Sequence, residues 1–146
     1  SVGSMQIFYY DLNTQTLFAD DASRLPPFDN GGGTYAYPDG TFGSAVRADV
    51  YACEEGADIR PGMTRQEVEA AGGYIAALYR YTTQQKQVLE RMKDGEPLDD
   101  AQYIDFENLL ISDVNGTFWV PQYSTEGDQV MATLSQNCGQ PRYLRP

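Results

Sequence analysis

Polar and apolar residues alternate most clearly over residues 45–52. Val46 and Val50 would share one face of an extended segment, and Arg47 and Asp49 would lie on the other face. Alternation with a period of two is typical of a half-buried β-strand. The sequence therefore predicts a strand over 45–52.

Two further stretches have the pattern of β-hairpins. Apolar and aromatic residues flank a polar turn within about 6–19, and such residues pack well on a pleated surface. Asp11 and Asn13 are interpreted as turn formers, because Asp and Asn tolerate turn dihedrals and can bond their own backbone. A second hairpin is predicted within 34–52, with its turn at Pro38-Asp39-Gly40.

Helix-starting signals occur at several points along the chain. Thr64-Arg65-Gln66-Glu67 is a capping-box sequence, in which two side chains satisfy backbone N–H groups at the helix start. It predicts a short helix over about 64–72. Capping residues followed by apolar residues predict further helices over about 83–94, 99–111 and 125–137.

Residues 74–81 fit two interpretations. A heptad-like series through Val68, Ile75 and Leu78 would continue the preceding helix, whereas the double glycine and the tyrosines favour a strand. We favour the strand and keep the helix as the alternative. With a short strand over 117–120, the chain is predicted to be an α+β fold: an antiparallel sheet built from hairpins, with three or four short helices.

The length of 146 residues suits one domain with a real core. Residues 1–5 are small, polar and without pattern, and we interpret them as a cloning remnant before a single α+β domain over 6–146. No apolar run approaches the roughly 18 residues that span a bilayer, and no signal peptide is visible. We expect that a native N-terminal segment has been removed.

The net charge of −11 argues against several partners. Nucleic-acid binding needs a surface of Lys and Arg that neutralises phosphates, and the same holds for anionic lipid. The acidity is interpreted mainly as a source of solubility. We therefore predict no nucleic-acid partner.

Two cysteines, Cys53 and Cys138, are too few for a zinc site and are not spaced as a redox pair. They could form one disulfide, which would contribute about 4 kcal/mol on the chain-entropy model. The alternative is a pair of buried thiols, and the sequence leaves both open.

Catalytic chemistry has few candidates in this chain. There is no histidine, which removes Ser-His and Cys-His activation, and both glycine-rich phosphate-binding motifs are absent. The spacing in Asp113-x-Asn115-Gly116 does not match an EF-hand loop. A hydrolase with two carboxylates about 5–10 Å apart stays open as an unfavoured hypothesis. We predict no catalytic, cofactor-binding or metal-binding residue, and no cofactor.

Eleven tyrosines are unusual for a chain of this length. Packing on the faces of the sheet explains most of them, because each offers a large apolar area with a polar tip. Exposed aromatic residues could instead bind a peptide, a sugar or a partner strand. The candidate aromatic binding surface consists of Tyr9, Tyr35, Tyr37, Tyr51 and Trp119.

Several segments together resemble an uncharacterised bacterial family best represented in planctomycetes, whose members have one N-terminal membrane span followed by a YDLNTGxLF segment. The matching segments are Phe8-Tyr9-Tyr10-Asp11-Leu12-Asn13-Thr14 with Leu17-Phe18, Val46 to Cys53, Tyr74 to Thr82, and Trp119-Val120-Pro121 with the late Cys138. Two positions depart from the family. Gln15 replaces the usual turn glycine, and Glu54-Glu55-Gly56 stands where relatives have a second cysteine.

The resemblance implies a domain outside the cytoplasm, tethered to the bacterial inner membrane by a segment absent from this sequence. It also favours the strand over 74–81 and an oxidised Cys53–Cys138 pair. It supplies no activity. Our main hypothesis is a non-enzymatic extracytoplasmic structural or interaction module, with an unknown envelope protein or ligand as partner. The alternative is a carbohydrate- or peptide-binding module that uses exposed aromatic residues.

Overall fold

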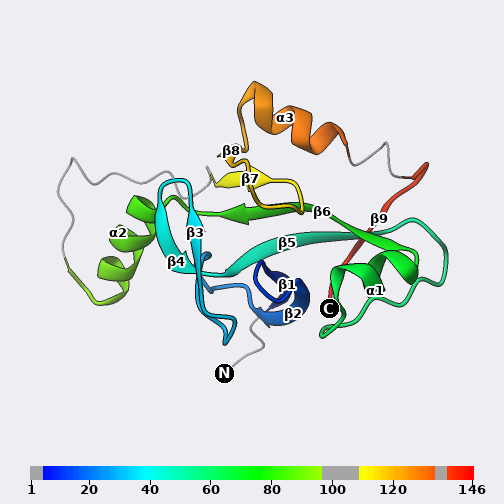
Figure 1. The fold of residues 1–146 in the computed structure, drawn as a ribbon, viewed down its shortest axis with the longest axis horizontal. Coiled ribbons are helices and arrows are strands. Elements are labelled where there is room, and N and C mark those ends of the chain that lie inside the picture. Colours follow the sequence, from blue (N-terminus) through cyan, green and yellow to red (C-terminus); the bar gives the residue numbers. More distant parts are fainter. Residues whose placement is uncertain (1–4, 97–108, 134–137) are drawn as a thin grey trace.

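The computed structural model describes residues 5–96, 109–133 and 138–146. Within them, one antiparallel sheet has the strand order β2-β1-β5-β6-β7-β8, and β9 pairs with β5 (Figure 1). The strands of this sheet are β1 (Gln6–Asp11), β2 (Thr16–Asp21), β5 (Ala45–Ala52), β6 (Gly73–Arg80), β7 (Leu110–Ser112), β8 (Val120–Pro121) and β9 (Arg142–Leu144).

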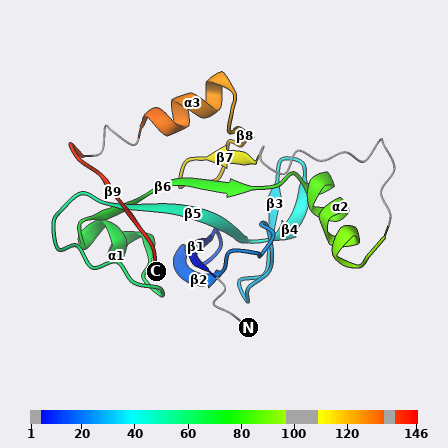
Figure 2. The ribbon, with the colours of Figure 1, turned by 180° about the vertical axis from the view of Figure 1, so that it is seen from behind.

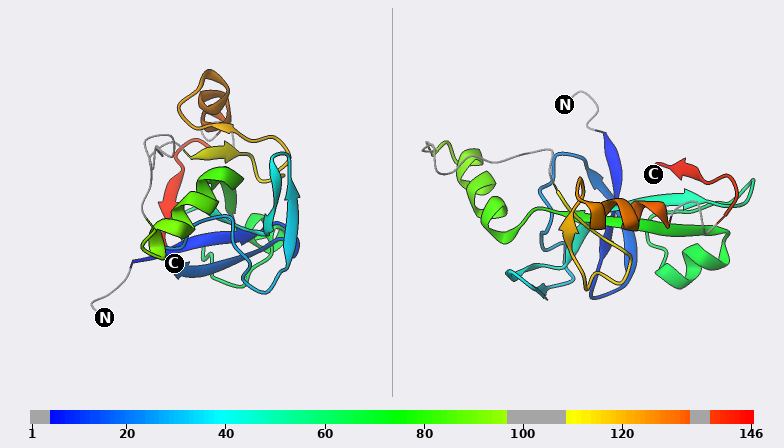
Figure 3. Two further views of the ribbon diagram at one scale, coloured as in Figure 1. Left: turned by 90° about the vertical axis from the view of Figure 1, so that its left-hand side faces the viewer. Right: turned by 90° about the horizontal axis from the view of Figure 1, so that it is seen from above.

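The other elements surround this sheet. They are the hairpin of β3 (Thr34–Tyr37) and β4 (Gly40–Gly43), and the helices α1 (Arg65–Ala70), α2 (Thr83–Lys93) and α3 (Thr125–Ala132). Helices α1 and α2 lie at opposite ends of the long strands β5 and β6, as the view from behind also shows (Figure 2). Helix α3 lies along the β7–β8 edge, whereas α2 projects away from the sheet (Figure 3).

The predicted α+β class is confirmed, and so are the main strands. β5 occupies the predicted residues 45–52, and its even-numbered side chains are buried while 47, 49 and 51 are half-buried. The β1–β2 hairpin forms with the predicted turn, where the Asp11 carboxylate accepts the N–H groups of Asn13 and Thr14. The ambiguous stretch 74–81 forms strand β6 through Arg80, and β6 is buried along its whole length.

Local capping chemistry fixes where the three helices begin. Thr64 and Thr82 each form a complete capping box, with Glu67 and Gln85 respectively, and the Ser124 hydroxyl caps α3. The helices predicted over 64–72 and 83–94 are confirmed as α1 and α2. The helix predicted over 125–137 is confirmed through Ala132 as α3; residues 134–137 lie outside the described residues.

Two predictions near the C-terminal half need correction. The helix predicted over 99–111 lies mostly outside the described residues, but Leu110–Ser112 is strand β7. The strand predicted over 117–120 is limited to Val120–Pro121, which pairs with β7 at the edge of the sheet, where proline is tolerated. Strand β9 was not predicted, because a three-residue strand carries almost no periodic signal.

The main core lies against one face of the sheet. Val68 of α1 packs there, and the β3–β4 hairpin contributes Tyr37. The buried residues of this core are Phe8, Tyr10, Leu17, Tyr37, Val46, Ala48, Val50, Val68, Ile75 and Leu78. The other face of β5 carries Arg47 and Asp49, so the two faces of the same strand have different chemistry.

Candidate functional site

The five aromatic residues of the predicted binding surface do not share one surface. Tyr9 is fully buried and packs against Phe18 and Phe28, with ring centroids 5.5 and 5.1 Å away. Tyr51 is half-buried on β5 and stacks on Tyr74 at 5.9 Å. Tyr9 is therefore a core residue and is not available to a ligand.

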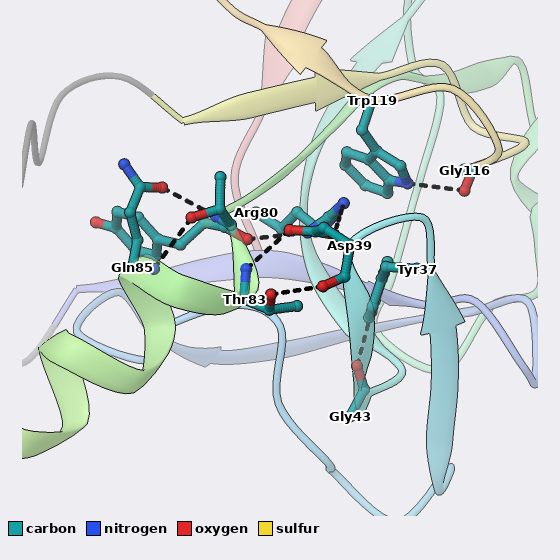
Figure 4. A network of polar contacts seen from close by, with 10 residues as sticks. Tyr37, Asp39, Gly43, Arg80, Thr83, Gln85, Gly116 and Trp119 are labelled. Carbon is teal, nitrogen blue, oxygen red and sulfur yellow. Dashed lines mark hydrogen bonds and ion pairs between the residues drawn. The ribbon is translucent and has the colours of Figure 1, made fainter.

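Two of the remaining three aromatic residues, Tyr37 and Trp119, lie beside the buried Arg80 (Figure 4). The Arg80 guanidinium lies 4.4 Å from the ring centroid of Tyr37 and 4.8 Å from that of Trp119, and Tyr35 packs on Tyr37 at 5.0 Å. Arg80 is only 1 % exposed. Cation–π contacts with two rings and an ion pair to Asp39 at 2.8 Å hold its charge inside the protein.

Asp39 connects this cluster to the start of α2. Its carboxylate accepts the Thr83 N–H at 2.9 Å, and the Thr83 hydroxyl donates to the Asp39 carbonyl at 2.8 Å. Burial opposes ionisation of Asp39, but hydrogen bonds from Arg80 and Thr83 outweigh it and hold the pKa of the carboxyl below its ordinary value. The cluster pins the β3–β4 hairpin to β6 and α2, so we assign it a structural role.

An open pocket of about 390 Å³ lies on the other face of the sheet. Arg47 and Asp49 project into it from β5, and Tyr79 projects from the neighbouring position on β6, because Arg47 and Tyr79 are paired residues. Its lining residues are Arg47, Asp49, Tyr79, Tyr81, Leu109, Gln122 and Tyr123. We call this site the Arg47 pocket.

Asp49 is the acceptor of the Arg47 pocket. The hydroxyl of Tyr79, which donates to Met131 Sδ at 3.4 Å, lies near its carboxylate, and the hydroxyl of Tyr143 lies 3.5 Å from Oδ1. Burial raises the pKa of Asp49 in spite of these two hydroxyl groups and the nearby Arg47 charge. Burial and the Asp49 charge in turn raise the pKa of Tyr79. The pocket therefore holds a partly desolvated carboxyl group.

Arg47 is the donor of the pocket. Among the ion pairs of the described residues, none includes its guanidinium, which lies 5.7 Å from the ring centroid of Tyr79. A guanidinium carries five N–H donors in a planar fork and no acceptor. Arg47 therefore presents donors to the same space into which Asp49 presents acceptors.

The backbone around Asp49 is irregular. The pairing of β5 with β6 shifts register between Asp49 and Val50, which marks a β-bulge. On the other edge of β5, β1 pairs with residues 45–47 and β9 with residues 50–52, so the partner strand changes at Asp49. Bulges are enriched beside functional sites, where they re-aim a side chain.

The two cysteines also lie together. The Cys138 thiol hydrogen-bonds to Cys53, and both residues are thiols in the structure. Burial and this neighbouring thiol raise the pKa of Cys53 to about 11. The predicted disulfide would thus join two neighbouring thiols, and its formation stays a prediction.

Carboxylates elsewhere in the described part of the chain do not form a second convincing site. A cavity of about 380 Å³ is lined by Asp113 and Glu126 together with Phe118, but both carboxylates are exposed. A general acid at neutral pH needs its pKa raised by burial. Within the described part of the chain, no group of three or more metal-ligating side chains is found.

Sequence patterns indicated part of the Arg47 pocket but not its function. The alternation over 45–52 placed Arg47 and Asp49 on the non-core face. Tyr79 is not among the residues of the predicted aromatic surface, and Tyr143 was missed because its strand is short and far away in sequence. Comparison with protein-family models, curated proteins and solved structures finds no match for this chain. No helix among the described residues is long and apolar enough to cross a membrane.

Proposed function

We propose that this chain is a non-enzymatic interaction module that acts outside the cytoplasm and binds a neutral carbohydrate in the Arg47 pocket. The observation that carries the proposal is an open pocket in which the Arg47 donors, which form no ion pair with any described residue, face the desolvated carboxyl of Asp49 beside tyrosine rings. Small-molecule sites typically combine such aromatic walls with a few convergent polar groups.

Sugar hydroxyls suit this pair of polar residues. A hydroxyl both donates and accepts, so one sugar can donate to Asp49 and accept from Arg47. The rings of Tyr81 and Tyr123 offer apolar area against the C–H face of a pyranose, and Tyr123 is 74 % exposed. The volume of about 390 Å³ is in the range of small-molecule pockets.

Charge favours a neutral ligand over an acidic one. The chain carries a net charge of −11, which disfavours the approach of polyanions, and Asp49 lies inside the pocket itself. Asp49 is also the single carboxylate among the lining residues that the structure describes. Glycoside hydrolysis usually needs a second carboxylate across the bond, so the pocket is better suited to binding than to cleavage.

The extracytoplasmic location is the second part of the proposal. Disulfides form and persist in oxidising compartments, and two thiols in contact would pair there. The membrane tether expected from the family resemblance belongs to the same hypothesis. Fractionation of cells that produce the native protein would test it; recovery in the cytosol alone would contradict it.

Calorimetric titration with neutral mono- and disaccharides tests the binding site. Arg47→Met and Asp49→Asn should each weaken binding about tenfold or more, because each loses a charge-assisted hydrogen bond worth about 1.5–3 kcal/mol. Arg145→Met and Glu96→Gln are matched controls, since both residues are exposed and lie outside the lining. Equal loss in the controls would contradict the assignment, and binding of short peptides but not sugars would overturn the ligand class.

A further inference from the structure

Strand β9 brings a residue from the C-terminal end of the chain to Asp49 of the Arg47 pocket. It pairs with the second half of β5, and Tyr143 is the direct partner of Tyr51. The Tyr143 hydroxyl lies 3.5 Å from Asp49 Oδ1, and its ring packs on Tyr51 at 5.4 Å. The position of β9 therefore decides whether Tyr143 reaches Asp49.

Few contacts other than this pairing hold β9 in place. It has three residues, and the side chains of Arg142 and Tyr143 are exposed while Leu144 is half-buried against the core. A cavity of about 630 Å³ lies between the residues that lead into β9 and the end of β5. Short segments with little buried surface open with small free energies.

The two cysteines lie where the end of β5 meets the start of β9. Ala52, the last residue of β5, pairs with Arg142, the first residue of β9, and Cys53 directly follows Ala52. Cys53 is anchored by its N–H, which donates to the Gly72 carbonyl at 2.9 Å. Cys138 lies four positions before Arg142 and touches Cys53 through its thiol. A bond between the two sulfur atoms would close the open end of the β5–β9 pair.

We infer that Cys53 and Cys138 form a disulfide that locks β9 onto β5 and thereby holds Tyr143 on Asp49. The bond is a clamp for the contact between Tyr143 and Asp49 of the Arg47 pocket. It requires only the thiol contact and the β5–β9 register, and it does not depend on whether the pocket binds a sugar.

The reaction needs an oxidant, for which a low-molecular-weight disulfide such as oxidised glutathione is sufficient. One cysteine thiolate attacks it, releases one glutathione thiolate and forms a mixed disulfide. The second cysteine then attacks the mixed disulfide, forms the Cys53–Cys138 bond and releases the second glutathione. The two protein thiols lose two protons and two electrons, and the glutathione disulfide takes them up. Because the pKa of Cys53 is about 11, closure should be slow at neutral pH and faster in mild alkali.

Intact-mass measurement after incubation with oxidised glutathione tests the bond directly. We expect a loss of about 2 Da with no glutathione adduct, no remaining reactive thiol, and a melting midpoint roughly 10 °C higher. The Cys53→Ser variant should instead hold one glutathione on Cys138. Two remaining thiols, two adducts or a disulfide-linked dimer in the wild-type chain would overturn the inference.

Amide hydrogen exchange tests the clamp separately from the bond. In the oxidised protein, exchange in residues 142–144 should slow by about tenfold or more relative to the Cys53→Ser/Cys138→Ser double variant, while the β1–β2 hairpin should not change. Equal exchange in β9 with the bond formed would refute the locking role. If the bond forms and the clamp acts but no sugar binds, the proposed function fails and this inference stands.

Discussion

Replacement of Asp39 by asparagine tests how the buried charge of Arg80 is held inside the fold. Asn keeps the shape of Asp and can still accept the Thr83 N–H, but it removes the charge that balances Arg80. Arg80 is 1 % exposed and has nowhere to regain water. The substitution therefore isolates the electrostatic part of the cluster.

The expected loss follows from the geometry. Breaking a fully buried ion pair costs about 3–5 kcal/mol, and a hydrogen bond to a charged group contributes about 1.5–3 kcal/mol. The Asp39 side chain is 35 % exposed, so solvent screens part of the interaction. The loss should therefore be smaller than for a fully buried ion pair and close to that of a hydrogen bond to a charged group. We expect Asp39→Asn to lower the free energy of unfolding by about 2–3 kcal/mol, and the melting midpoint by roughly 5–10 °C.

Urea unfolding followed by tryptophan fluorescence is a suitable assay, because Trp119 is the single tryptophan of the chain and lies over Arg80. Asp58→Asn is the matched control, since its ion pair with Arg60 is on the surface and no measurable change is expected.

The pKa of Asp39 is lowered in the folded protein, so its contribution to stability is present above the ordinary carboxyl pKa and is lost as the pH falls through the folded value. The difference between wild type and Asp39→Asn should therefore stay constant from pH 7 down to the ordinary carboxyl pKa of about 4 and shrink below it. Equal unfolding midpoints for wild type and Asp39→Asn at pH 7 would refute the reasoning.

Three further predictions concern packing, capping and alkaline stability. Gly43→Ala should destabilise the fold by about 3 kcal/mol or more in urea unfolding, because a Cβ there would overlap the backbone of Phe28, whereas Gly139→Ala meets no atom within 4 Å and should be neutral. Thr82→Ala should cost about 1 kcal/mol by loss of the α2 capping box, and an unchanged melting midpoint would contradict that role. Burial and the Asp20 charge raise the pKa of Tyr9 to about 12, so the unfolded chain ionises first and stability should fall as the pH rises above about 10. Urea midpoints that stay constant from about pH 9 to pH 11 would contradict this expectation.

Local signals in the sequence were sufficient for most of the fold. The alternation over 45–52 and the capping sequences at Thr64 and Thr82 depend only on neighbouring residues, so they could be recognised without knowing the tertiary structure. β7 and β9 have three residues each and become strands only because a longer strand offers them a free edge. Their hydrogen bonds come from tertiary pairing, which no local pattern encodes.

The candidate site was less accessible to sequence reasoning for the same reason. Asp49 and Tyr143 are 94 positions apart, and their contact depends on the register of β9 on β5. The predicted aromatic surface relied on residue type alone, and type does not distinguish a packed ring such as Tyr9 from an exposed one such as Tyr123. The charged residues on the non-core face of β5 were the available signal.

A nuclear magnetic resonance titration of the isotope-labelled chain with neutral mono- and disaccharides tests the central claim most directly. Binding in the Arg47 pocket predicts saturable shift changes concentrated at Arg47, Asp49, Tyr79 and Tyr123. These changes should be lost in Arg47→Met and retained in Arg145→Met. The account is contradicted if no sugar produces saturable changes, or if the changes lie away from the pocket and persist in Arg47→Met.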